Sequence, residues 1–129
     1  VLPHIQKPLS LRRRPGDCKD VTNKKIVLEH VGTNLCYNTS SILYLHCVVD
    51  RGNPKPKITW LKDGSYLPKA VKLLNNGTTL LFQNTTIDLQ AEVDGLSPVG
   101  GNYTCIATNP SGTAAVSSVI IPFGGKPFS

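Results

Sequence analysis

Short apolar runs separated by turn residues occupy the chain from position 24 onward. The runs are rich in β-branched and other apolar residues, and Gly, Pro, Asn and Asp lie between them, which is typical of an all-β sandwich or barrel. Helical spacing is scarce, and only "TIDLQAEVDGL", residues 86–96, could form a helical turn. Short extra strands are allowed near residues 65–67 and within residues 1–23. The pattern predicts seven main strands, over residues 26–31, 41–49, 57–62, 71–74, 78–83, 101–109 and 113–121.

The alternation of side chains within three of these strands points both central cysteines inward. Successive residues of a strand face opposite sides of the sheet, so Cys47 shares a face with Leu45, and Cys105 shares one with Tyr103. Trp60 is inward on a third strand. Two inward cysteines on different strands can join stacked sheets over a tryptophan ring. A Cys47–Cys105 bond would stabilise the fold by about 4 kcal/mol in the chain-entropy account.

Four cysteines permit two disulfides in three pairings. Zinc is a poor alternative because structural sites need closely paired ligands, whereas the nearest cysteines, Cys36 and Cys47, are eleven positions apart. His4, His30 and His46 have no paired spacing either, so no metal site is predicted. Cys18 with Cys36 is the second pairing, although Cys18 could instead bond to a neighbouring domain or another chain.

Sequons favour an extracellular compartment with disulfides formed. An Asn-x-Ser/Thr triplet without a central Pro is the acceptor for N-glycosylation in secreted chains. The predicted acceptors are Asn38, Asn76, Asn84 and Asn102. Asn102 faces outward but lies near the sheet, so we expect a lower glycan occupancy there.

Net charge is concentrated at the start of the chain. Residues 1–25 carry seven of the 14 Lys and Arg residues but only two of the eight acids, which gives +5 of the formal +6. A basic segment of this kind can bind polyanions, and outside the cell the relevant class is heparan sulfate rather than nucleic acid. A solvated linker is the plainer interpretation. The candidate polyanion-binding residues are Lys7, Arg12, Arg13, Arg14, Lys19, Lys24 and Lys25.

Nothing in the chain predicts catalysis, and no cofactor is expected. His46 adjoins Cys47, but the alternation sends the two side chains to opposite faces, so they cannot act as a Cys-His pair. Phosphate-binding, zinc-protease and serine-hydrolase motifs are absent from the sequence. No run reaches the roughly 18 apolar residues of a membrane span, and no direct membrane insertion is expected.

Three stretches together resemble the I-set of the immunoglobulin superfamily: "CVVDRGNPKPKITWLKDG", "GTTLLFQNTTI" and "GGNYTCIATNPSGTA". Tyr103, two residues before Cys105, corresponds to the tyrosine at the corner before the sixth strand. Two departures stand out. Val99 replaces an Asp that is usual in the I-set, after an unusually long "DLQAEVDGLSPV", and "NLCYNTSS" lengthens the loop before the second strand.

The resemblance implies a two-sheet sandwich over residues 24–122, after a basic N-terminal arm of residues 1–23 and before a tail of residues 123–129. It further implies a non-enzymatic binding module of a matrix or cell-surface protein, with an extracellular protein ligand or receptor as its partner. A purely structural spacer domain is the alternative.

Overall fold

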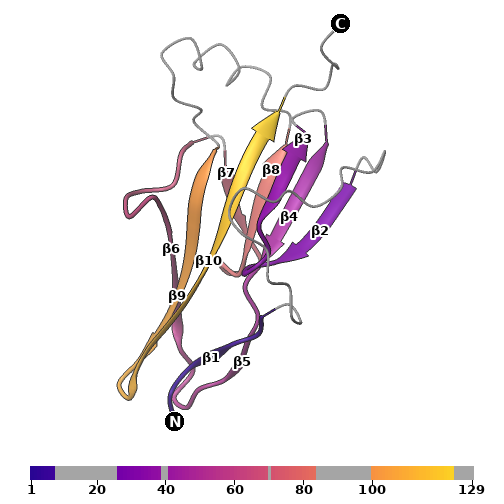
Figure 1. Cartoon of the computed structure of the whole chain (residues 1–129). Coiled ribbons are helices and arrows are strands. Elements are labelled where there is room, and N and C mark those ends of the chain that lie inside the picture. Colours follow the sequence, from indigo (N-terminus) through magenta and orange to yellow (C-terminus); the bar gives the residue numbers. More distant parts are fainter. Residues whose placement is uncertain (8–25, 39–40, 70, 84–99, 124–129) are drawn as a thin grey trace, which may run out of the picture.

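Two four-stranded sheets stack against each other to form the body of the protein (Figure 1). The structure is a computed structural model that describes residues 1–7, 26–38, 41–69, 71–83 and 100–123. The first sheet contains, in spatial order, β2 (Ile26–His30), β4 (Ile42–His46), β8 (Thr79–Gln83) and β7 (Val71–Leu74). The second contains β3 (Leu35–Asn38), β10 (Gly112–Phe123), β9 (Gly101–Asn109) and β6 (Lys57–Lys62). A separate short pair consists of β1 (His4–Ile5) and β5 (Val49–Arg51).

This arrangement confirms the predicted all-β sandwich. The bounds of β6, β7 and β9 are those predicted, whereas the strand expected over residues 41–49 is split into β4 and β5. The described residues include no helix that could cross a membrane.

The core lies between the two sheets and is built from the inward positions of both. Leu43 and Leu45 of β4 are fully buried, as are Phe82 of β8 and Tyr103 of β9. The Phe82 and Tyr103 rings meet edge to face with centroids 5.1 Å apart, a geometry that aromatic pairs favour. The period-two alternation seen in the sequence therefore sets which side chains fill the core.

The start of the chain contains β1, a short extra strand of the kind that the sequence allowed within residues 1–23. β1 pairs antiparallel with β5, and Ile5 is only 2% exposed within the main core. The exposed His4 ring also contacts the Asp50 carboxylate at 2.6 Å. The buried Ile5 side chain and the contact between His4 and Asp50 therefore hold residues 1–7 against the sandwich. The strand itself is too short to show an alternating pattern in the sequence.

The segment "NLCYNTSS" differs from the expected loop. Four of its residues form β3, which pairs in parallel with the last residues of β10. β9 occupies one edge of β10, and β3 pairs with the opposite edge at Ile120 to Phe123.

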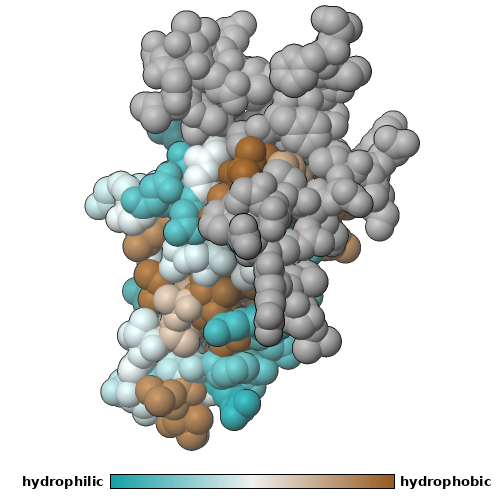
Figure 2. All heavy atoms as spheres, in the orientation of Figure 1, coloured by the Kyte–Doolittle hydropathy of each residue, from teal (hydrophilic) through white to brown (hydrophobic). Residues whose placement is uncertain are grey.

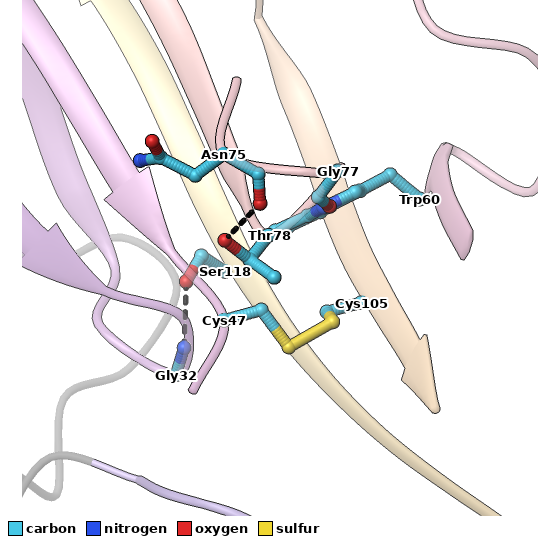
Figure 3. Close-up of a disulfide and its surroundings, with 8 residues drawn as sticks. All are labelled: Gly32, Cys47, Trp60, Asn75, Gly77, Thr78, Cys105 and Ser118. Atoms are coloured by element: carbon cyan, nitrogen blue, oxygen red, sulfur yellow. Dashed lines mark hydrogen bonds between the residues drawn. A yellow bond between two sulfur atoms is a disulfide. The ribbon is translucent and has the colours of Figure 1, made fainter. Parts of the chain in front are cut away.

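The turn between β2 and β3 is fastened to β10. Gly32 adopts a φ of 108°, in the region that favours glycine, and its N–H donates to the buried Ser118 hydroxyl at 2.7 Å (Figure 3). The N–H of Val119 donates to the Asn34 side chain at 2.8 Å. These bonds fix where β2 ends and β3 begins.

Candidate functional site

The Cys47–Cys105 disulfide joins the two sheets beside the tryptophan (Figure 3). Its Cα atoms are 6.4 Å apart, and both side chains are at most 1% exposed. Trp60 lies opposite Cys105 in the β6–β9 ladder, and its indole N–H donates to the Gly77 carbonyl at 2.8 Å. Trp60 thereby ties the β7–β8 turn of the first sheet to the second sheet. Cys47 is structural, and its engaged sulfur cannot act as a nucleophile.

Cys36 in β3 is also disulfide-bonded. Its predicted partner, Cys18, lies outside the described residues, so that pairing stays a prediction. Three groups of predicted site residues likewise lie outside the described part: Arg12 to Arg14, the lysines at 19, 24 and 25, and Asn84. Lys7 is exposed at the end of the first described segment.

Two of the predicted glycan acceptors are described and exposed. Asn76 lies in the β7–β8 turn, and Asn102 is the second residue of β9, where its N–H bonds to Asp63. Asn38 is the last residue of β3. Glycan occupancy itself stays a prediction.

The outer face of the first sheet gathers apolar side chains and two histidines, and we call it the histidine face. Strand register places its members in rows: Ile26 beside Ile42; Leu28, Tyr44, Leu81 and Lys72 across all four strands; and His30, His46, Thr79 and Leu74 in the same order. The inward positions of β4 alternate with these, which is why Tyr44 and His46 face outward; for His46 the alternation in the sequence predicted this placement. No acidic residue is among these ten described positions.

Exposure of apolar side chains on this face is greatest on the edge strand. Leu28 is 64% exposed and Ile26 is 56% exposed.

Figure 2 shows, for one side of the molecule, apolar patches separated by polar surface. One lies at the end that carries the N-terminus, where Val1 and Leu2 are also exposed.

The outer face of the second sheet has a different character. Hydroxyl-bearing residues take many of its outward positions, and neighbouring hydroxyls contact one another: Thr104 lies 2.7 Å from Ser117, and Thr108 lies 3.2 Å from Thr113. The exposed Lys57 and the partly buried Leu61 and Ile106 share this face. The described part of the chain therefore presents one hydroxyl-rich face that carries Lys57 and one apolar, histidine-bearing face.

The two histidines of the histidine face are neighbours on adjacent parallel strands. Their ring centroids are 6.0 Å apart, and the Tyr44 ring stacks nearly parallel to His46. The His46 Nδ1 atom lies 2.9 Å from the Thr79 hydroxyl. Burial lowers the pKa of His46, and the nearby His30 lowers it further, because removal from water and a neighbouring like charge both disfavour the protonated ring.

Sequence reasoning considered each histidine separately and missed the pair. The runs "IVLEH" and "ILYLH" both end in histidine, but only the parallel register aligns His30 with His46. No group of three or more His, Cys, Asp or Glu residues suited to a metal ion occurs in the described segments.

Comparisons with known proteins identify relatives of this domain. The sequence model of the immunoglobulin domain matches residues 25–109, well over half of the chain. The tyrosine-protein kinase-like otk of Drosophila ananassae is 32% identical over 114 residues, which cover 84% of this chain and 10% of that protein. Human ADAMTS-like protein 3 is 42% identical over 76 residues, which cover 59% of this chain and 4% of that protein. The chain therefore spans a tenth or less of these relatives.

Solved structures agree with the fold. Extracellular domains 3–5 of Drosophila OTK share 30% identity at a TM-score of 0.56, over 71% of this chain and 28% of that one. The full ectodomain of mouse nectin-like molecule 4 shares 24% identity at the same TM-score, over 79% of this chain and 32% of that one; that likeness concerns the fold alone. The family match, the two stacked sheets and the disulfide between them show that this chain belongs to the immunoglobulin domain family.

Proposed function

We propose that the domain is a recognition module in the extracellular part of a larger protein and that it binds a protein partner through the histidine face. The observation that carries this proposal is the exposure of Leu28 and Ile26 beside Tyr44 on one sheet face. Clustered apolar exposure often marks an interaction site. The extracellular assignment is supported by the 30% identity to extracellular domains of Drosophila OTK.

The partner that fits this face presents apolar side chains with carboxylates among them. The described charged and titratable groups of the face are Lys72, Tyr44 and the two histidines, and none of them is acidic. Carboxylates on the partner would therefore meet the positive charge of the exposed Lys72, which raises association rates and favours the correct partner. Tyr44 supplies an aromatic side chain of the kind enriched at the centre of interfaces.

A binding screen with matched variants tests the proposal. The domain is displayed as a multimer against a panel of extracellular proteins, and each binder is retested with Leu28→Asp and with Ala115→Asp. Ala115 is exposed on β10 in the second sheet, so its variant adds the same charge to the other face. We expect Leu28→Asp to abolish binding and Ala115→Asp to leave it unchanged. The reverse pattern, or equal binding by both variants, would contradict the proposal.

A structural spacer is the competing function. A spacer needs no exposed apolar face, so it predicts that no panel member binds and that Leu28→Asp changes nothing beyond a small loss of stability. Loss of a specific binder in Leu28→Asp, with thermal unfolding unchanged, therefore separates the two functions.

The basic start of the chain supports a second activity, binding of heparan sulfate. Its support is the charge of +5 within residues 1–25. On immobilised heparin the wild type should need more than physiological salt for elution. Binding should weaken as salt is added, because surface charges are screened beyond about 8 Å at physiological ionic strength. A triple Ala variant of Arg12, Arg13 and Arg14 should elute earlier than a matched triple Ala variant of the exposed Lys55, Lys57 and Lys69. Equal elution of the two variants would remove the hypothesis.

A further inference from the structure

His30 and His46 occupy the same register position on two adjacent parallel strands, and both face outward. Their strands are held together at this point by a hydrogen bond from the Val31 N–H to the His46 carbonyl, 2.8 Å long. The anchored turn after β2 also restrains the position of His30. We propose that these two histidines bind a divalent transition-metal ion, with Zn²⁺ as the first candidate.

The spacing of the two rings is close to that of two ligands of one ion. Zn²⁺ binds an imidazole nitrogen at about 2.0 to 2.1 Å, so two rings on one tetrahedral ion have centroids about 5.2 Å apart. The observed separation is 6.0 Å, so the rings must approach each other slightly to share an ion. The His30 side chain is exposed, and the torsion that turns its ring is soft. Its ring can therefore reorient toward the ion without movement of the backbone.

Thr79 supplies an outer partner for one of the two ligands. Its hydroxyl lies 2.9 Å from His46 Nδ1 and also accepts a hydrogen bond from the Asn75 amide at 3.2 Å. Metal binding at His46 Nε2 selects the tautomer in which Nδ1–H donates to this hydroxyl. Such outer contacts fix the orientation of metal-bound histidines. Thr79 is 1% exposed, so its position is fixed by packing.

Two imidazoles fill only part of a tetrahedral coordination sphere, and water completes it. Affinity is therefore lower than at closed sites with three or four protein ligands. Imidazole also suits Cu²⁺ and Ni²⁺, and Cu²⁺ should bind most tightly by the usual order of divalent ions. Bound metal would add positive charge to a face whose described charged groups are already basic.

Calorimetric titration of the secreted, untagged domain with ZnCl₂ tests the site. We expect one Zn²⁺ per chain. Thr79→Val removes the hydrogen-bond partner of His46 and should weaken Zn²⁺ binding by about tenfold or more. His30→Gln and His46→Gln each remove a ligand, and each should weaken Zn²⁺ binding at least as much as Thr79→Val does. His4→Gln is the matched control, because His4 pairs with Asp50 in the separate β1–β5 pair. The control should bind Zn²⁺ like the wild type.

Paramagnetic Cu²⁺ gives a local readout that needs no substitution. In nuclear magnetic resonance spectra of the wild type, substoichiometric Cu²⁺ should broaden the ring signals of His30 and His46 before those of His4. Broadening centred on His4, equal affinity of the His30→Gln and His4→Gln proteins, or no Zn²⁺ binding would overturn the proposal. The protein-recognition role is tested by different variants, so either result stands without the other.

Discussion

Replacing Cys47 and Cys105 together by Ala removes the covalent link between the two sheets. The bond closes a loop of 58 residues, and the chain entropy of such a loop corresponds to about 4 kcal/mol of stability. Both side chains are buried, so the shorter Ala side chains leave unfilled space near Trp60 and add to the loss. Single domains are typically stable by about 5 to 15 kcal/mol. We therefore expect the variant to lose much of its free energy of unfolding.

Urea unfolding followed by tryptophan fluorescence measures this loss. Trp60 is the only tryptophan and is 5% exposed, so its emission reports on the core. The midpoint should fall, and the denaturant slope should rise because the unlinked unfolded chain exposes more surface. A double Ala variant of Cys18 and Cys36 is the comparison, since the predicted bridge between them would close eighteen positions and contribute about 3 kcal/mol. A loss below about 1 kcal/mol in the Cys47 and Cys105 variant would refute the entropic reasoning.

Three further predictions concern described residues. Because burial lowers the pKa of His46 below its ordinary 6.5, the unfolded chain binds more protons there than the folded one, and stability should fall as pH drops from about 6.5 through the lower folded-state pKa. Thermal unfolding across this range should show that slope in the wild type and a smaller one in His46→Gln; equal slopes would assign the dependence to other groups. Trp60→Phe leaves the Gly77 carbonyl without its donor and should cost about 1 to 3 kcal/mol in urea unfolding followed by circular dichroism, whereas an unchanged midpoint would mean that the bond adds nothing. Peptide mapping of the secreted protein after glycosidase treatment should find a glycan at Asn76, in an exposed turn, more often than at Asn102 within β9, and the opposite order would contradict the effect of strand placement.

The sandwich could be predicted because its signals are local. Alternation within β4 and β9 marks Leu45 and Tyr103 as inward without knowledge of their partners, and both are fully buried. β3 could not be predicted in this way, because four residues beginning at Leu35 become a strand only when β10 offers a free edge. β1 depends in the same way on β5 and on the space that Ile5 fills. Pairing between distant segments decides both elements.

The candidate site could be predicted only in part for the same reason. Outward placement of Tyr44 and His46 follows from the alternation around Leu45 and Cys47. The position of His30 beside His46 does not follow from the alternation, because no local pattern indicates that β2 runs parallel to β4 rather than antiparallel. An antiparallel register would have placed a different residue beside His46.

The parallel alignment of β2 with β4 has its cause in the path of the chain between them. Parallel neighbours need a crossover connection, and here the crossover passes through β3, a strand of the opposite sheet. The turn that starts the crossover is bonded to β10 through Ser118 and Val119, so the second sheet helps to set the position of a strand in the first. Leu28 and His30 therefore occupy fixed positions beside Tyr44 and His46 even though β2 is an edge strand. A surface whose spacing is fixed in this way loses little conformational freedom on binding, which favours affinity for a protein partner and for a metal ion alike.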